Sequence, residues 1–368
     1  MTKNAPDFIK KSVFNEKTVL VSTGLVIGLI MVVLLAAGNP PNMAFCAACF
    51  LRDITGALGL LHSPGAQYMR PEIPGLVVGA CAAAVYKKEF AAKGGSSPLT
   101  RFVLGMCAMV GALIFMGCPM RMLLRLAGGD LNAAVGFAGL AAGVVSGALF
   151  LKAGFSLGKA YALPKTEKYL FPAANVLLIL LALALPAVFY VSESGSGALR
   201  APVYISLAAG LAVGACGYHA RICFIGDIRD FVLFKTPGAA LCSAVIFAVV
   251  LIGNISTGRF RIGFNGQPFA HSDFIWNFAG LYLTGFACTL LGGCPFRQLV
   301  MAGGGNADAA VTVLGLTAGA AFSHNLGINS TPAGASPNGK AAFAICLIVT
   351  LAIAYTNIKK TEPGGARA

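Results

Sequence analysis

One short motif occurs twice and combines a thiol, a helix-breaking proline and a cation. Residues 117–121 read Gly-Cys-Pro-Met-Arg and residues 293–297 read Gly-Cys-Pro-Phe-Arg, each inside a long apolar run. Proline lacks a backbone N–H and suits the first turn of a helix, so one helix is expected to end near each cysteine and another to begin at Pro119 or Pro295. Helix N-termini carry unpaired N–H groups and partial positive charge. The motif therefore places a thiol and an arginine where an anion or a thiolate is favoured.

The composition is that of a protein embedded in a membrane. The 368 residues are 57% hydrophobic and 11% charged, they include 46 glycines, and the mean hydropathy is +0.79. A soluble chain of this size carries far more charge. The first apolar run, Thr18 to Ala37, is too long for the core of a signal peptide and lacks a small-residue cleavage site, so it is expected to stay as the first span.

Apolar runs predict an all-α, polytopic membrane protein with ten spans. They fall at about 18–38, 73–86, 101–118, 131–151, 171–190, 202–216, 237–253, 274–293, 307–327 and 340–357. Four further segments are too short or too charged to cross a bilayer and are expected to be re-entrant half-helices, at 43–61, 119–127, 219–234 and 295–302.

The two halves of the chain repeat one another. Residues 117–143 and 293–319 align at a shift of 176 with 14 identities in 27 positions. A weaker match at a shift of 174 pairs the segment from Cys49 with the segment from Cys223. Five spans per half is an odd number, so the second repeat is expected to enter the bilayer with the opposite orientation.

Basic residues indicate how the chain is oriented. The loops 1–17, 87–101, 152–168 and 357–368 hold 15 Lys and Arg, and the loops 192–200, 254–273 and 328–340 hold four. The positive-inside rule places the first set in the cytoplasm. The expected organisation is a cytoplasmic tail (1–17), a first membrane repeat (18–190), a second, inverted repeat (191–357) and a cytoplasmic tail (358–368). The net charge of +14 is explained by these loops, and no nucleic-acid partner is expected.

The eleven cysteines lie mostly in apolar segments, which argues against a disulfide scaffold. Isolated thiols such as Cys81, Cys107 and Cys288 are expected to be small packed side chains. The Cys46-x-x-Cys49 pair suits a soft metal or a redox dithiol, although it lacks a second such pair. No resident cofactor or metal is expected. No nucleotide-binding loop is present, so the chain is not expected to be an ATPase. It is not expected to be an enzyme of another kind.

Charged residues inside the short segments have two possible roles, which are pairing with each other and facing the thiols. A buried charge is usually paired, so aspartates such as Asp53, Asp227 and Asp308 are expected to neutralise arginines and hold the half-helices in place. Arg121 and Arg297 each follow a Cys-Pro break by two residues and are expected to face the same end as the thiol. The alternative for these two arginines is an ion pair with Asp130 or Asp308.

The Cys-x-x-Cys-Phe-x-Arg-Asp stretch at 46–53, the paired Gly-Cys-Pro-x-Arg motif and the Gly-Gly tails resemble the YeeE/YedE family over almost the whole chain. The closest resemblance is to the YedE branch linked with selenium metabolism. It implies uptake of thiosulfate across the bacterial inner membrane by an hourglass-shaped protein with inverted repeats, whose cysteines meet the substrate in turn. By this resemblance Cys49, Cys118 and Cys294 are pathway cysteines, and internal symmetry adds Cys223 as the fourth.

The sequence therefore predicts a transporter of a small sulfur or selenium anion. Its expected partners are that anion, membrane lipid and, by family resemblance, a TusA-like sulfur carrier protein in the cytoplasm. A membrane thiol-disulfide oxidoreductase and a soft-metal transporter are the alternatives. The residues expected to line the pathway or to support the motif are Cys49, Cys118, Cys223, Cys294, Arg121, Arg297, Gly117, Pro119, Gly293, Pro295, Asp53 and Asp227.

Overall fold

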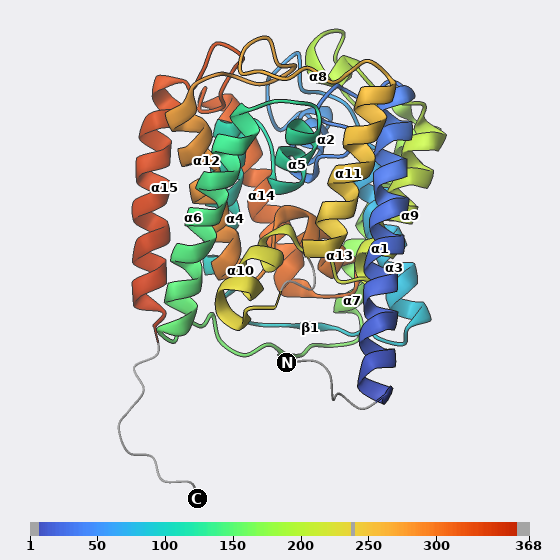
Figure 1. Cartoon of the computed structure of the whole chain (residues 1–368), viewed down its shortest axis with the longest axis vertical. Helices are drawn as coiled ribbons and strands as arrows, with labels where there is room; N and C mark the ends of the chain where they lie inside the picture. The colour runs from blue at the N-terminus through green and yellow to red at the C-terminus, as the bar shows by residue number, and fades with distance from the viewer. Residues whose placement is uncertain (1–6, 237–239, 359–368) are drawn as a thin grey trace, which may run out of the picture.

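The computed structural model describes residues 7–236 and 240–358, and of residues 7–15 only the backbone (Figure 1). Nearly all of the predicted tail 358–368 and the first six residues of the predicted tail 1–17 lie outside this part of the chain. From Asp7 onward that tail continues as the start of the first long helix.

Long helices occupy all ten apolar runs. Their bounds are α1 Asp7–Ala36, α3 Glu72–Tyr86, α4 Pro98–Phe115, α6 Asn132–Lys152, α7 Glu167–Ala184, α9 Val203–His219, α11 Ala240–Ser256, α12 Phe274–Leu291, α14 Ala307–Asn325 and α15 Pro337–Thr356. Short helices stand at the four sites predicted for half-helices, namely α2 Ala47–Ala57, α5 Pro119–Ala127, α10 Phe224–Phe234 and α13 Pro295–Gly303. The remaining elements are η1 Pro186–Val188, α8 Gly195–Ala198 and the strands β1 Lys93–Gly94 and β2 Tyr161–Ala162, which pair antiparallel.

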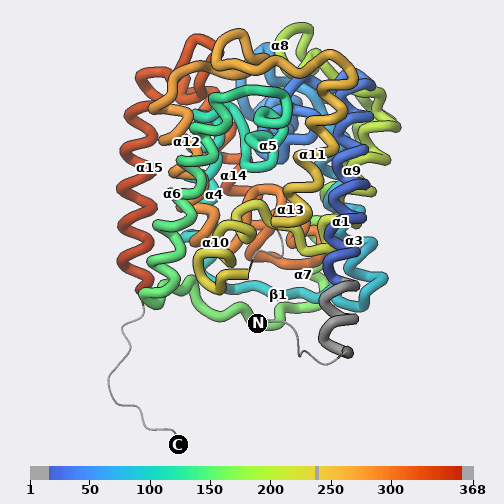
Figure 2. The backbone as a smooth tube through the Cα atoms, viewed as in Figure 1, coloured from blue at the N-terminus to red at the C-terminus, as the bar shows by residue number. Residues whose placement is uncertain are grey.

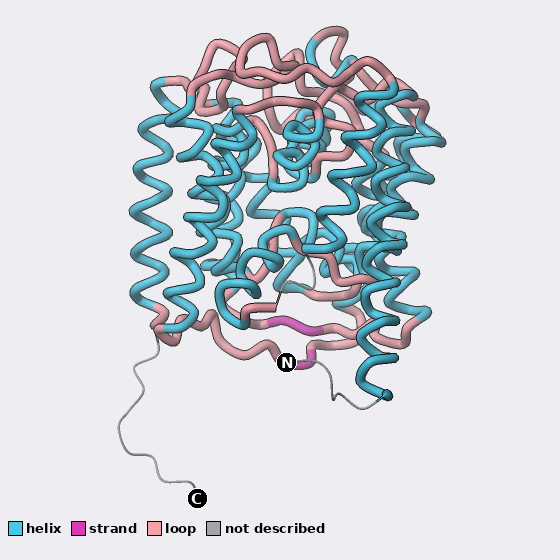
Figure 3. The backbone as a smooth tube through the Cα atoms, viewed as in Figure 1, coloured by secondary structure: helices cyan, strands magenta, loops and turns pink. Residues whose placement is uncertain are grey.

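The helices confirm the predicted class, an all-α polytopic membrane protein. In the described part of the chain, seven helical stretches are long and apolar enough to cross a bilayer, and α3 and α11 are shorter apolar helices. The long helices run side by side along the vertical axis, and most connecting loops gather at the two ends (Figure 3). Most of the large hydrophobic side chains on α7 and several on α15 are exposed, as expected for a surface that meets lipid.

Helix packing repeats between the two halves. Helix α3 packs along α9, and its counterpart α11 packs along α1. In the same way α6 packs along α12, and α14, the counterpart of α6, packs along α4. The equivalent helices α4 and α12 also pack against each other. Helices α2 and α5 lie in the upper part of the molecule and α10 and α13 in the lower part (Figures 1 and 2). This exchange of partners is the pattern that two inverted repeats produce.

Glycines let these helices approach closely. A Cβ on Gly79 of α3 would clash with the Leu211 carbonyl of α9, and a Cβ on Gly214 of α9 would clash with the Leu76 carbonyl of α3. Small residues at such contacts are typical of helices in membranes, because bringing backbones together maximises van der Waals packing. The close contacts hold the scaffold on which the half-helices stand.

The loops separate by charge as the sequence predicts. The loops after α3 and after α6, which contain β1 and β2, lie at the lower end, where α15 also finishes (Figure 1). The loops that precede α9, α12 and α15 lie at the upper end. The lower end therefore carries the lysine-rich loops that were expected to face the cytoplasm.

Candidate functional site

Both Cys-Pro motifs break a helix as expected. Helix α4 ends at Phe115 and α5 begins at Pro119, while α12 ends at Leu291 and α13 begins at Pro295. Cys118 and Cys294 are the N-cap residues of α5 and α13, both with extended backbone conformations. The helix before each break closes with a left-handed residue, Met116 in the first repeat and Gly292 in the second. Glycine adopts that conformation without the steric penalty that Met116 incurs.

The glycine of each motif makes room for the arginine. A Cβ on Gly117 would stand 2.7 Å from Cδ of Arg121, and a Cβ on Gly293 would stand 2.8 Å from Cγ of Arg297. Real Cβ atoms do not approach this closely. The two arginine chains therefore fold back over the glycine toward the break, on the side of the thiol.

The first thiol pair joins two helix N-termini. Cys46 is the N-cap residue of α2, and its Sγ accepts a hydrogen bond from the Cys49 N–H at 3.3 Å. The same Sγ lies 3.7 Å from Sγ of Cys118, the N-cap residue of α5. Both cysteines are buried. Two positive helix ends thus converge on a pair of sulfur atoms, which is a favourable place for a small anion.

The second repeat builds the same arrangement. Cys223 is the N-cap residue of α10, and its Sγ accepts a hydrogen bond from the Gly226 N–H at 3.3 Å. Its side chain also lies close enough to interact with Cys294, the N-cap residue of α13. Cys288 of α12 is buried close enough to interact electrostatically with both thiols. It was expected to be an isolated packing residue, and only the fold reveals its position.

The structure corrects the symmetry partner of Cys223. The sequence alignment paired it with Cys49, but the residue that caps the equivalent helix is Cys46. The correct shift is 177, which also aligns the adjacent Arg52–Asp53 ion pair with Arg229–Asp230. That repeated Arg-Asp dipeptide was the signal in the sequence that could have given this register. Cys49 lies one turn further into α2, where its Sγ is 4.0 Å from the Met116 carbonyl oxygen.

Arg121 connects Cys49 to the first site. Its Nη1 lies 3.2 Å from Sγ of Cys49 and also donates to the Met116 carbonyl. Nε donates to the Asn42 carbonyl at 3.1 Å, and Nη2 donates to the Phe269 carbonyl at 2.9 Å. The side chain is only 1% exposed, and no carboxylate in the described part of the chain pairs with it. Carbonyl oxygens solvate the guanidinium group but do not neutralise its charge, which remains available to an anion.

Arg297 faces a polar cavity at the lower side of the second site. The cavity has a volume of about 230 Å³ and is lined by Glu89, Ala91, Lys93, Tyr218, Arg221, Arg297, Met301, Gly304 and Asn306. Glu89 pairs with Arg221 at 3.5 Å and accepts a hydrogen bond from the Tyr218 hydroxyl at 3.2 Å. Among the described residues Arg297 has no ion-pair partner. The second site thus has a polar space beside its arginine.

The expected ion pairs form for most of the buried charges. Asp53 binds Arg52 at 2.5 Å and also Arg70 at 2.8 Å, a buried arginine that the sequence did not single out. Asp130 binds Arg125 at 2.6 Å, and Asp308 lies 3.7 Å from Arg101. The alternative in which Asp130 or Asp308 pairs with Arg121 or Arg297 is therefore wrong, because other arginines take these carboxylates.

Asp227 departs from the expectation that it neutralises an arginine. Its Oδ2 accepts a hydrogen bond from the Ser243 hydroxyl at 2.6 Å, and its Oδ1 has no partner although it is buried. Of the other predicted support residues, Gly117, Pro119, Gly293 and Pro295 lie in or beside the helix breaks, and Asp53 lies inside α2.

The two thiol sites lie back to back. Helix α2 contacts α13, and α5 contacts α10. In Figure 1 the first pair of half-helices stands above the second. Phe224 and Phe296 pack edge to face between α10 and α13, with ring centroids 6.2 Å apart. Four half-helices thus meet near the middle of the molecule, where transporters with inverted repeats hold their substrates.

Comparison with known proteins adds an independent finding. Residues 219–356 match the model of a family described as sulphur transport, from the last residue of α9 to the end of α15. This segment contains Cys223, Cys294, Arg297 and the cavity residue Asn306. No curated protein matches the chain. Over residues 219–356 the chain is therefore similar to the sulphur transport family, in agreement with its resemblance to the YeeE/YedE family.

Proposed function

We propose that the protein carries a small sulfur-containing anion, such as thiosulfate, through the membrane by way of two Cys-Arg sites. The observation that supports this most strongly is the repeated pairing of two thiol-capped helix N-termini with an arginine that no carboxylate neutralises. An arginine without its own counter-ion is suited to an anionic substrate. The sulphur transport match over the second site supports the same substrate class.

The chemistry of each site suits a thio-anion. Sulfur atoms of the substrate are soft and polarisable, as are the thiols of Cys46 and Cys118 in the first site and of Cys223 and Cys294 in the second. Thiol S–H groups and the helix N–H groups are donors, and the guanidinium groups of the motif supply positive charge. Oxyanions without sulfur would gain less from the thiol pairs. The anion passes from one site to the other across the contact between the half-helices.

We infer the orientation of the two sites from the loop charges. With the lysine-rich lower end in the cytoplasm, the first site faces outward and the second site, with its polar cavity, faces inward. The protein then takes up its substrate across a bacterial inner membrane, and both termini are cytoplasmic. A cytoplasmic sulfur carrier of the TusA type is the partner proposed at the inner end.

Uptake by the isolated chain tests this function. Proteoliposomes that contain only this protein should accumulate labelled thiosulfate faster than empty liposomes. Labelled sulfite and selenite, assayed in parallel, separate a sulfur substrate from a selenium one. Transport of none of these anions would overturn the proposal. Interconversion of thiols and disulfides with added quinone, without uptake, would favour the oxidoreductase alternative.

A further inference from the structure

A buried carboxyl group stands one helical turn from the second thiol site. Asp227 lies in the first turn of α10, and its N–H donates to the Cys223 carbonyl at 3.0 Å. The residue is 8% exposed. In the described part of the chain Asp227 and Glu72 are the buried acidic residues that no Arg or Lys neutralises.

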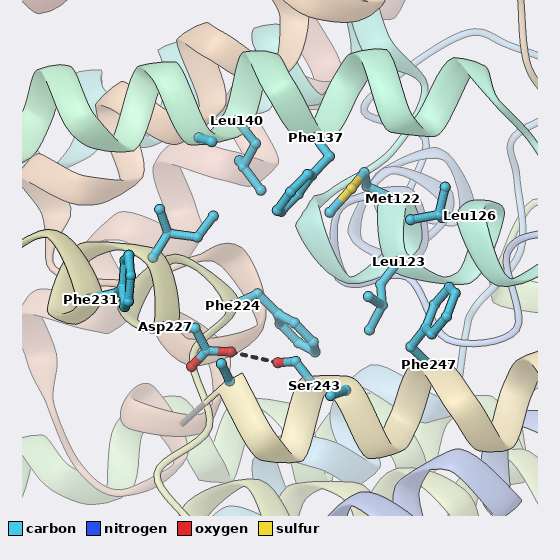
Figure 4. Close-up of a pocket in the computed structure, with 14 residues that line it drawn as sticks. Met122, Leu123, Leu126, Phe137, Leu140, Phe224, Asp227, Phe231, Ser243 and Phe247 are labelled. Atoms are coloured by element: carbon cyan, nitrogen blue, oxygen red, sulfur yellow. Dashed lines mark hydrogen bonds between the residues drawn. The ribbon is translucent and has the colours of Figure 1, made fainter. Parts of the chain in front are cut away.

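The surroundings of Asp227 are apolar. Its side chain lines a cavity of about 460 Å³ between α5, α6, α10 and α11 (Figure 4). Apart from Asp227 and Ser243 the lining is hydrophobic, and it includes Phe224, Phe137 and Leu123. Burial of this kind disfavours the charged form of a carboxyl group. The single hydroxyl of Ser243 satisfies Oδ2 and leaves Oδ1 without a partner.

The titratable groups around Asp227 do not offset its charge. Cys223 and Asp230 lie on its own helix, and Cys242 lies on α11. The cavity residues from α5 and α6 are all apolar. Asp230 follows one turn later on α10, and its side chain is 36% exposed.

An anion at Cys223 and a charged Asp227 compete for the same helix end. The N-terminus of α10 stabilises one negative charge nearby, and two such charges in its first turn repel each other. Protonation of Asp227 removes the repulsion, so binding of the anion favours uptake of a proton. By linkage, protonation of Asp227 must favour binding of the anion to the same degree.

We propose that Asp227 is a proton-binding site and that one proton crosses with each anion, so that transport is driven by the proton gradient. This inference rests on the proposed function, because it requires an anion at the Cys223 and Cys294 thiols. The proton enters and leaves by reversible protonation of the Asp227 carboxylate, and no other bond changes. The positive charge of the proton also offsets part of the cost of moving an anion into a negatively charged cytoplasm.

Calorimetry of the full-length protein in detergent tests the coupling. Sodium thiosulfate is titrated at one pH in two buffers of different ionisation enthalpy, and the difference in heat gives the number of protons taken up. Wild-type protein should take up protons on binding, and Asp227→Asn should take up none. At pH 8 the variant should also bind thiosulfate at least about fivefold more tightly than the wild type does. This factor is the lower end of the range of typical couplings between two sites.

Glu72→Gln is the matched control, because Glu72 is also buried without a cation. It should keep the proton uptake of the wild type. Ser243→Ala serves if Asp227→Asn does not fold: loss of the hydroxyl destabilises the carboxylate, so the pH of greatest proton uptake should rise. Equal heats in both buffers for the wild type, or normal proton uptake in Asp227→Asn, would overturn the coupling alone. No heat in either buffer would overturn thiosulfate as the substrate and the coupling with it.

Discussion

The sulfur atom of Cys46 lies 3.7 Å from the sulfur atom of Cys118, and each cysteine caps a different half-helix. The contact brings the N-termini of α2 and α5 to one point. A small substrate at this point meets two thiols and two positive helix ends together. The equivalent pair in the second repeat is Cys223 and Cys294.

Replacing the motif cysteines by serine should abolish uptake. Serine is nearly isosteric with cysteine but is far less polarisable and less acidic, so Cys118→Ser and Cys294→Ser should leave the protein folded but lose thiosulfate transport. Cys81→Ser, on the face of α3 away from the sites, should behave as wild type. Expression level and uptake rate measure the two effects. Normal uptake in both motif variants would show that these thiols only fill space.

The thiols that cap α2 and α10 should respond differently to serine and alanine. Serine caps a helix well, whereas alanine leaves an N–H group unpaired at a cost of about 0.5–2 kcal/mol. Cys46→Ala and Cys223→Ala should therefore lower the melting temperature in detergent, and the two serine variants should not. All four should lose uptake. If Cys46→Ser transports normally while Cys49→Ser does not, the pathway includes Cys49 in place of Cys46.

Arginine at position 121 should be needed for its shape as well as its charge. Arg121→Lys keeps the charge but loses the planar fork, so the apparent affinity for thiosulfate should fall about tenfold, the equivalent of ~1.4 kcal/mol for one charge-assisted bond. Arg121→Ala should lose more. Uptake kinetics measure the affinity, and an unchanged value in Arg121→Lys would show that the fork does not contact the substrate.

The Arg125–Asp130 pair provides the structural control. Arg125→Ala leaves the buried Asp130 carboxylate without its ion-pair partner, which should destabilise the folded protein by roughly 3–5 kcal/mol and lower its melting temperature. Adding Asp130→Ala should restore it. The same Asp130→Ala change should not rescue Arg121→Ala, because Asp130 binds Arg125 and not Arg121. Rescue of transport in that double variant would count against substrate contact by Arg121.

A labelling experiment should place the two ends of the molecule on opposite sides of the membrane. Lys159 is exposed in the lower loop after α6, and Asn265 is exposed in the upper loop before α12. A membrane-impermeant maleimide should label Asn265→Cys from outside the cell and Lys159→Cys only in inverted vesicles. Reaction of both from the same side would refute the inverted arrangement.

Acid should destabilise the upper loop through His271. This buried side chain donates from Nε2 to the Ile114 carbonyl at 2.9 Å and accepts at Nδ1 from the Asp273 N–H at 3.2 Å. Burial lowers the pKa of His271 below its usual 6.5. The unfolded chain then binds more protons than the folded one, so stability is full above about pH 6.5 and falls as the pH drops through the folded pKa. The melting temperature should decrease less between pH 7.5 and pH 5 in His271→Gln than in wild type.

The sequence predicted the scaffold better than the contacts within it. Apolar runs and the prolines of the two motifs located every long helix and both breaks, because these features act locally along the chain. Which acidic residue pairs with which arginine depends on which helices pack together, and no single segment of the sequence determines that. Arg70 joins Asp53 from a loop 17 residues away, and Arg101 rather than Arg297 approaches Asp308. The role of Cys46 was hidden because the match at a shift of 174, with identical Cys, Phe, Asp and Ile, outweighed the repeated Arg-Asp pair.

Helices α7 and α15 lie outside the exchange of partners that relates the two repeats. Helix α7 packs mainly on α3, whereas its counterpart α15 packs on α4 and α12. Exchanging the two repeats about the internal two-fold axis would therefore not produce the same structure open at its other end. The outer helices α7 and α15 would have to change the helices on which they pack. For the proposed transport cycle, this asymmetry implies that the inward-open and outward-open states are not related by the internal two-fold symmetry.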